Sequence, residues 1–171
     1  MNITKVGKFK KVSFDEFEKS VKDNLTNIAD TGWIKFTYDK IKLPRRATKG
    51  SAGYDFKSPF TFRLDPGKTI LIQTGVSAKI EPGWFLAIFP RSGLGFKYRL
   101  RLDNTVGVID SDYFYSDNEG HIMIKMTNCG EEEININAGD GIAQGVFIPY
   151  GITFDDKTDK ERNGGFGSTG K

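Results

Sequence analysis

The stretch "RLDPGKTILIQTGVSAKIEPGWFLAIFPRSG", Arg63 to Gly93, indicates the kind of fold. Its two Pro-Gly pairs, Pro66-Gly67 and Pro82-Gly83, fit type II turns, because proline presets φ at the second turn position and glycine accepts a positive φ at the third. Apolar and β-branched runs flank both turns, which predicts strands at about 68–80 and 84–89. Short strands joined by tight turns are typical of all-β domains.

The chain beyond Trp33 continues in the same pattern, with short β-rich runs between glycines and prolines and no convincing stripe of apolar residues at helical spacing. Many short strands at close spacing indicate a sandwich, a jelly roll or a small barrel, and we expect an all-β jelly roll. The further strands that we expect are 33–38, 60–64, 105–109, 121–127, 133–137 and 142–149.

The start of the chain has a different pattern. Ser13, with Glu16 three residues later, predicts a capping box at the start of a helix. Apolar residues then recur at spacings of three and four, which predicts one helix over about 14–28, closed by Asp30-Thr31-Gly32. We expect it to pack on the domain or on a neighbouring subunit, and a partner surface is the alternative. The apolar stripe consists of Phe14, Phe17, Val21, Leu25 and Ile28.

These patterns divide the chain into three parts: a helical extension at 1–32, a β jelly-roll body at 33–158 and a flexible glycine-rich arm at 159–171. At 171 residues the chain has the size of one domain. The arm ends in "RNGGFGSTGK", where a disordered terminus is the ordinary reading, although that reading does not account for Phe166, Ser168 and Thr169.

The composition and charge of the chain limit the kinds of partner and site that it can have. A net charge of +3 with interspersed signs does not favour a nucleic-acid polymer as partner, and no apolar run is long enough for a membrane helix. Cys129 is the one cysteine, so no internal disulfide can form, and we expect a reducing, cytoplasmic setting. His121 is the one histidine, which excludes multi-histidine metal sites.

Polar or glycine-rich segments interrupt the β runs at places where chemistry is plausible. Each has an ordinary reading as a loop, a turn or a terminus when it is taken alone. The segments are "GSAGYDF" (50–56), "PRSGLGF" (90–96), "NTVGVIDSDY" (104–113), "GDGIAQGVF" (139–147) and "RNGGFGSTG" (162–170).

Two of these segments carry the clearest chemistry. Arg91, Ser92 and Gly93 follow an apolar strand and can present N–H and O–H donors to phosphate oxygens, or Arg91 can form a structural ion pair. Asp110 follows "GVI", so a half-buried carboxylate at a strand end could take a proton from a bound water, with Tyr113 nearby. The alternative is a charged turn, "DSD", which is our interpretation of Asp112.

The remaining segments are more ambiguous. Asp55 lies between Tyr54 and Phe56, where an unpaired buried carboxylate would be costly, so it should be paired or serve a metal-bound water. Gln144 lies among apolar residues and needs a partner, either a backbone group or a ligand phosphate.

Taken together and in this order, the five segments resemble the five motifs of the trimeric dUTPase family, in its bacterial and phage branch. The resemblance runs from about Ala52 to Gly170 and is most specific in "PRSG", "GVIDSDY", "AQGVF" and "GGFGSTG". It implies a homotrimer with active sites between subunits, which hydrolyses dUTP to dUMP and pyrophosphate with Mg²⁺, limits uracil incorporation into DNA and supplies dUMP for dTMP synthesis.

The resemblance also implies roles for single residues. Asp110 is the general base, Tyr113 packs under the deoxyribose and Asp55 meets the metal through water. The uracil pocket is formed by Asn104, Gly107, Val108 and Ile109, with Met123 closing it. The triphosphate is held by Arg91, Ser92, Gly93 and Gln144 and by the arm residues Arg162, Phe166, Gly167, Ser168 and Thr169, of which Phe166 stacks on uracil.

The chain departs from the family pattern in three places. Gly141 stands where "GDRIAQ" usually has arginine, "FYSDNEG" (114–120) is inserted after Tyr113, and Arg162 lies one residue nearer to Phe166 than is common. Two other functions compete: a dCTP deaminase of the same superfamily, disfavoured by the Asp110/Tyr113 pair, and a regulatory protein that uses the helix or the insertion as a partner surface.

Overall fold

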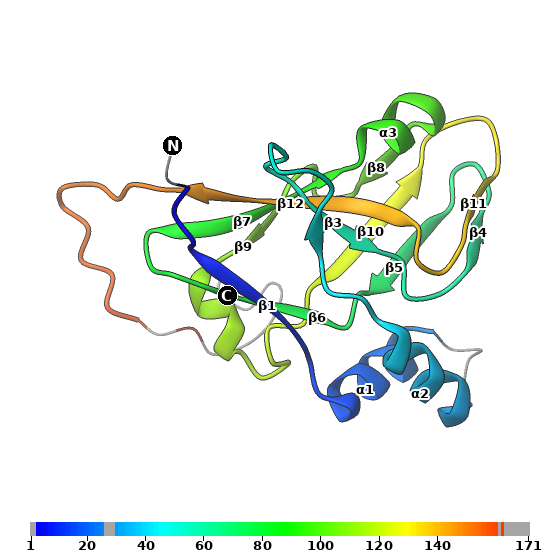
Figure 1. The fold of residues 1–171 in the computed structure, drawn as a ribbon, viewed down its shortest axis with the longest axis horizontal. Coiled ribbons are helices and arrows are strands. Elements are labelled where there is room, and N and C mark those ends of the chain that lie inside the picture. Colours follow the sequence, from blue (N-terminus) through cyan, green and yellow to red (C-terminus); the bar gives the residue numbers. More distant parts are fainter. Residues whose placement is uncertain (1–2, 26–29, 161, 163–171) are drawn as a thin grey trace.

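The computed structural model describes residues 3–25, 30–160 and 162, and it is mostly β structure, with the first two helices of the chain side by side at one end and the third α-helix apart from them on the opposite side (Figure 1). The elements in chain order are β1 (Gly7–Lys11), α1 (Phe14–Asn24), α2 (Thr31–Lys40), β2 (Arg45–Arg46), β3 (Tyr54–Lys57), β4 (Phe62–Leu64), β5 (Thr69–Gln73), β6 (Val76–Ile80), β7 (Trp84–Pro90), α3 (Ser92–Tyr98), β8 (Leu100–Leu102), β9 (Gly107–Ile109), the 3₁₀ helix η1 (Ser111–Tyr115), β10 (Met123–Asn128), β11 (Ile134–Ile136) and β12 (Gly141–Pro149).

The strands pair antiparallel in small sheets, as expected for a jelly roll. The largest sheet has the order β2-β3-β12-β7-β9, and a second sheet has the order β5-β10-β8. The pairs β1-β6 and β11-β4 complete the arrangement. The predicted all-β jelly-roll class is therefore confirmed, and β12 crosses the molecule as the longest strand (Figure 1).

Both Pro-Gly turns form as predicted. Gly67 and Gly83 have φ of 72° and 84°, values that favour glycine. The closing hydrogen bonds run from Lys68 N to Asp65 O (3.1 Å) and from Trp84 N to Glu81 O (3.2 Å). The predicted strand 68–80 is divided, however, because Gly75 has φ of 68° and bends the chain between β5 and β6.

The strand predicted at 33–38 is wrong, since these residues lie in helix α2. Asp30 does not close the first helix but caps the second, because its carboxylate accepts a hydrogen bond from Gly32 N at 2.9 Å. The buried stripe of α2 is Ile34, Thr37 and then Ile41, a spacing of three and four that the aromatic residues between them obscure. The expectation of no further helix fails again at α3.

The other predicted strands are confirmed, with shifts of one to two residues at their ends. They correspond to β4, β7, β9, β10, β11 and β12. Strand β1 was not predicted, because the sequence "GKFKK" offers one apolar side chain, Phe9, among its lysines. The composition of this segment does not favour a strand, and β1 forms because it pairs with β6.

Helix α1 starts as predicted, but the capping box is only half formed. Ser13 Oγ accepts a hydrogen bond from Glu16 N at 3.1 Å. The Glu16 side chain does not reach back to Ser13 N; the carboxylate of Glu119 accepts that N–H at 2.7 Å instead. The helix ends at Asn24 with Leu25 as its C-cap, short of the predicted end at 28, and the stripe residue Ile28 lies outside the described residues.

The helices and the sheets share one core. Phe17 and Val21 of α1 and Ile34 of α2 are fully buried, and they belong to the same cluster as Ile72 and Leu86 of the strands. Each large apolar side chain that is removed from water contributes about 1.5–3 kcal/mol, so the extension is an integral part of the fold. Among the described residues, no helix has both the length and the apolar character needed to cross a bilayer.

Candidate active site

The first pocket opens beside β9 at the edge of the largest sheet, and we call it the β9 pocket. Its volume is about 290 Å³. It brings together four of the predicted site residues, Asn104, Gly107, Ile109 and Met123. The other lining residues are Leu71, Ile88, Leu102, Asp103, Ile122, Ile124 and Lys125, so the pocket is largely apolar.

The main chain of β9 is suited to hydrogen bonding with the polar edge of a nucleobase. Strand β9 pairs with β7 on one side, and no other strand of the described residues pairs with it on the other. Gly107 and Ile109 are buried while the side chain of Val108 is 56% exposed, so the pocket contacts the strand mainly through its small residue and its backbone. N–H and C=O groups at a free strand edge can pair with an external partner.

Asp110 and Tyr113 lie directly after β9. The Asp110 side chain is 49% exposed, whereas Tyr113 is buried, with an exposed fraction of 2%. The Tyr113 hydroxyl donates to His121 O at 2.8 Å and accepts from Asn118 Nδ2 at 2.9 Å. The Asp110 carboxylate is therefore accessible, whereas the Tyr113 ring is covered in this conformation.

Arg162 reaches this group from the far end of the chain. Its Nη2 lies 3.1 Å from Asp110 Oδ2, and its Nε lies 3.5 Å from Asp112 Oδ1. The guanidinium carbon lies 5.4 Å from the centroid of the Tyr113 ring, a cation–π distance. The structure thus places Arg162 at the predicted base, whereas its predicted companions Phe166, Gly167, Ser168 and Thr169 lie outside the described residues.

The electrostatics of Asp110 suit a proton acceptor. Partial burial raises the pKa of its carboxyl above the ordinary value of 3.8, the Arg162 guanidinium acts in the opposite direction, and the neighbouring Asp112 carboxylate raises the pKa further. A base with a raised pKa holds a transferred proton more firmly than an ordinary surface carboxylate does. Sequence reasoning did not foresee the contribution of Asp112.

A second pocket lies over β3 and β12, and we call it the β12 pocket. Its volume is about 410 Å³. The predicted residues Asp55, Arg91, Ser92 and Gln144 line it together, while Gly93 lies beside them at the start of α3. Its other lining residues are Ala47, Ser51, Ala52, Gly53, Phe89 and Val146.

Arg91 is held at this pocket by a carboxylate. Its Nε lies 3.4 Å from Asp55 Oδ1, so the ion-pair reading of Arg91 and the paired reading of Asp55 both apply. The Arg91 side chain is still 42% exposed, which leaves N–H donors for an anion. Gln144 Nε2 lies 3.5 Å from Pro90 O, a long contact that leaves its amide available to a ligand.

Gly141 lies directly beside Arg91 and leaves room for its side chain. A Cβ added at Gly141 would lie 2.9 Å from Arg91 Cδ, closer than side-chain atoms approach one another. The absence of a side chain at 141 therefore makes room for Arg91 in its observed position.

The β12 pocket offers one carboxylate to a metal. Among the described residues, no group of three His, Cys, Asp or Glu side chains is placed to hold an ion by itself. Mg²⁺ at triphosphate sites keeps several waters and takes one or two carboxylates together with phosphate oxygens. Asp55, lying at the pocket beside Arg91, fits that limited role.

The two pockets lie on opposite faces of the same sheet. Ile88 lines the β9 pocket and its neighbour Phe89 lines the β12 pocket. Successive side chains of a strand point to opposite faces, and the register agrees, since Ile88 pairs with Gly107 and Phe89 with Gln144. The residues predicted to bind one ligand are thus divided between two faces of a single chain.

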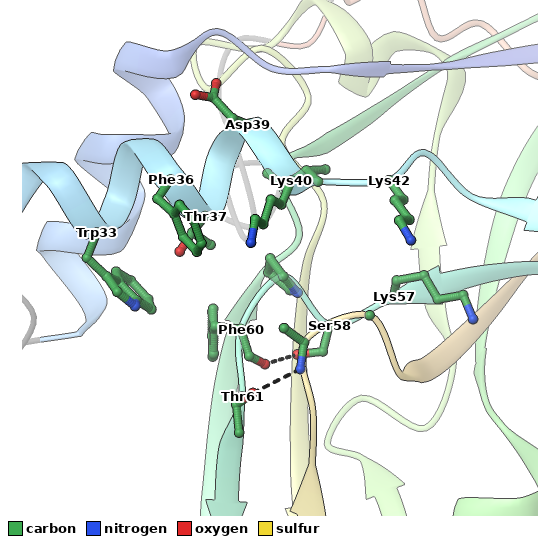
Figure 2. Close-up of a pocket in the computed structure, with 14 residues that line it drawn as sticks. Trp33, Phe36, Thr37, Asp39, Lys40, Lys42, Lys57, Ser58, Phe60 and Thr61 are labelled. Carbon is green, nitrogen blue, oxygen red and sulfur yellow. Dashed lines mark hydrogen bonds between the residues drawn. The ribbon is translucent and has the colours of Figure 1, made fainter.

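Another pocket between described residues lies elsewhere and contains none of the predicted site residues. It measures about 700 Å³ and lies between α2 and the turn after β3 (Figure 2). Its wall is fixed by local contacts, such as the Trp33 and Phe60 rings with centroids 6.0 Å apart and the 2.6 Å hydrogen bond from Ser58 Oγ to Phe60 O. Lys40 stacks on the Phe36 ring at 3.7 Å.

Comparisons with known proteins agree with the motifs. The sequence model of the dUTPase family matches residues 39–170. The deoxyuridine 5'-triphosphate nucleotidohydrolase of Lactococcus lactis is 42% identical over 139 residues, which cover 80% of this chain and 93% of that protein. The enzyme of the same name from Haemophilus influenzae is 43% identical over 141 residues, covering 78% of this chain and 90% of that protein.

Solved structures show the same fold. The dUTPase of Streptococcus mutans superposes with a TM-score of 0.60 at 40% identity, over 65% of this chain and 88% of that one. A dUTPase from phage phi11 of Staphylococcus aureus, described with a structural Mg(II) ion, superposes with a TM-score of 0.64 over 91% of this chain and 98% of that one, at 20% identity. With the motif residues gathered in two pockets and the family matched over 39–170, the chain belongs to the dUTPase family.

Proposed function

We propose that this enzyme hydrolyses dUTP to dUMP and pyrophosphate. The observation that carries the proposal is the distribution of the motif residues, with base-reading residues at the β9 pocket, Asp110 directly after strand β9, and anion-binding residues at the β12 pocket. A nucleoside triphosphate is a ligand with these two ends, one flat and uncharged and the other highly anionic. The names of the relatives agree with this substrate.

We further propose that the active enzyme is a homotrimer with its sites between subunits. The two pockets lie on opposite faces of the sheet and share no lining residue. One nucleotide cannot reach through a sheet to contact both faces. The β9 pocket of one subunit must therefore face the β12 pocket of a neighbour, which supports an assembly in which neighbours complete each site.

In the proposed reaction, Asp110 takes a proton from a water molecule as the water oxygen bonds to the α-phosphorus. The bond between the α-phosphorus and the oxygen that bridges to the β-phosphate breaks, and pyrophosphate leaves with that oxygen. Arg91, Ser92 and Gln144 would hold the phosphate oxygens and offset their charge. Phosphoryl transfer depends mainly on such positioning and electrostatic stabilisation.

Substrate selection is assigned to the β9 pocket. The free edge of β9 would pair with uracil through main-chain groups, with Asn104 beside it and Met123 closing the pocket. Tyr113 would lie against the deoxyribose and leave no room for a 2′-hydroxyl. The bases that lack the matching donor and acceptor pattern would leave backbone groups unpaired, a costly arrangement.

Mg²⁺ is the proposed cofactor, with Asp55 as its protein contact through water. When bound to the triphosphate, the ion neutralises phosphate charge. The ion pair between Asp55 and Arg91 means that Asp55 can orient Arg91 as well as a metal-bound water.

The segment 159–171 is proposed as an arm that closes over the nucleotide. Ordering one residue costs roughly 1–2 kcal/mol of backbone entropy, so closure requires new contacts with the ligand. Phe166 on the uracil ring and Gly167, Ser168 and Thr169 on the terminal phosphate would supply them. For that movement Arg162 must leave Asp110, which it contacts at 3.1 Å.

The test is pyrophosphate release from dUTP, dCTP, dTTP and UTP with Mg²⁺, using Asp110→Asn and, as a matched control, the exposed Asp117→Asn. We expect a clear preference for dUTP and a loss of about 10²–10⁴-fold in kcat for Asp110→Asn, the range for a general base. Full activity in Asp110→Asn, or no preference for dUTP, would refute the proposal. Release of ammonia from dCTP would favour a deaminase instead.

A further inference from the structure

The inserted segment 114–120 folds back underneath Tyr113. Ser116 Oγ lies 2.6 Å from Tyr113 O, and Asn118 Nδ2 donates to the Tyr113 hydroxyl at 2.9 Å. Asn118 Oδ1 lies 2.8 Å from Ser116 Oγ, which fixes the orientation of the amide. The hydroxyl of Tyr113 also donates to His121 O, so the oxygen at the far end of the ring is held from two sides.

The N-terminal helix holds the same segment from the outside. The Glu119 carboxylate accepts hydrogen bonds from Ser13 N at 2.7 Å and from Ser13 Oγ at 2.6 Å, at the start of α1. Glu119 has φ of 55°, in the left-handed region that a non-glycine residue adopts at some cost. One turn further along the helix, Glu16 Oε1 lies 3.2 Å from His121 Nδ1.

The insertion and the extension are thus connected to each other and to Tyr113. The connection runs from Ser13 through Glu119 and the adjacent Asn118 to the Tyr113 hydroxyl. The family match begins at residue 39, so helix α1 lies outside it. The segment 114–120 is an insertion by the sequence resemblance described above. Two features that the resemblance leaves without a role therefore meet at one residue of the active site.

We propose that Asn118 is a positioning residue that holds the far end of the Tyr113 ring in place and thereby sets the discrimination between deoxyribose and ribose, with helix α1 holding it through Glu119. The proposal rests on the proposed role of Tyr113 against the sugar. A 2′-hydroxyl is excluded by the close approach of the ring, so a small rotation about the Cα–Cβ bond of Tyr113, which displaces the whole ring together with its hydroxyl, would admit it. Asn118 prevents that rotation without touching the substrate.

The experiment compares kcat/KM for dUTP and for UTP within each preparation of the full-length enzyme. The ratio of the two constants is independent of the fraction of folded protein, so a merely structural defect would not change it. The variants are Asn118→Leu, Tyr113→Phe and the double variant, with Asp117→Leu as the control, because Asp117 is exposed and adjacent. Tyr113→Ala reports the role of the ring itself.

We expect Asn118→Leu to reduce the preference for dUTP over UTP about tenfold, the effect of one lost hydrogen bond to a buried group. Tyr113→Phe should act similarly, and the double variant should be no worse than either single one, because both remove the same interaction. Asp117→Leu should keep the wild-type preference. Ser13→Ala, which leaves the core side chains intact, should shift the preference in the same direction by about twofold.

The possible failures are distinguishable. If Tyr113→Ala loses the preference but Asn118→Leu and Ser13→Ala keep it, the positioning role of Asn118 is overturned while the proposed function stands. If Tyr113→Ala also keeps the preference, the proposed contact of Tyr113 with the sugar is wrong and the positioning role is overturned with it. Additive effects in the double variant would likewise overturn the proposal.

Discussion

Lowering the pH from about 7.5 to about 5 should destabilise the folded protein by about 2 kcal/mol through one side chain, His121. The imidazole is completely buried beside Phe17, and its Nε2 accepts a hydrogen bond from Gly75 N at 2.9 Å. The other nitrogen, Nδ1, therefore carries the proton and faces Glu16 Oε1. A second proton on Nε2 would point directly at the Gly75 N–H.

The magnitude follows from the pKa. Burial lowers the pKa of His121 from 6.5 to about 4, and the Glu119 carboxylate opposes the shift only in part. One pKa unit corresponds to about 1.36 kcal/mol, so the full linkage is about 3.4 kcal/mol. Because the folded pKa is depressed, this stability is present above pH 6.5 and is lost as the pH falls towards 4, with about 2 kcal/mol lost by pH 5.

Urea denaturation at the two pH values, at one fixed protein concentration, measures the change. The matched variant is His121→Gln, whose amide oxygen can accept the Gly75 N–H but does not titrate. Burial raises the pKa of Glu16, which acts in the opposite direction, but this effect of burial is common to both proteins. Wild type should lose about 2 kcal/mol more than His121→Gln.

An independent measurement is simple because the chain has one histidine. Its ring C–H resonance in an NMR titration belongs to His121 without further assignment. A midpoint near 6.5, or an equal pH dependence in wild type and His121→Gln, would refute the reasoning.

Three other outcomes are expected. Arg162→Ala removes the charge that lowers the pKa of Asp110, so the acid limb of the pH profile of kcat/KM should move to higher pH; an unchanged limb would contradict the observed pairing. Gly141→Ala should displace Arg91 and raise KM for dUTP several-fold with little change in thermal stability, as judged by steady-state kinetics and a melting curve. Asp30→Ala should lower the free energy of unfolding by about 1 kcal/mol, measured in urea, because α2 loses its N-cap.

The parts of the fold that sequence predicts well are those decided locally. The two Pro-Gly turns and the strands beside them follow from φ preferences that need no tertiary context. Helix α2 was missed because Trp33, Phe36 and Tyr38 resemble a β-rich run, although Ile34 and Thr37 are its buried face. Aromatic residues have little intrinsic preference for a helix, and packing against α1 decides the outcome.

For the candidate site, too, the sequence predicts the features that are decided locally and not those that depend on contacts between distant segments. The identities of Asp110, Arg91 and their neighbours could be read from contiguous motifs. Their separation onto two faces depends on the register of β12 and β9 against β7, which is set by pairing over long sequence separations. The contact of Arg162 with Asp110 spans 52 residues, and no local pattern in the sequence points to it.

The position of Ile88 next to Phe89 in β7 has a consequence for how this enzyme can evolve. A single-residue insertion or deletion within the strand would reverse every side chain beyond it, turning Phe89 inward and Ile88 outward. Both pockets would be lost in one step, whatever happened to the motif residues themselves. Variation in length must therefore be confined to segments outside β7, and the extra residues of this chain, 114–120, lie outside it, at the end of η1 and in the connection to β10.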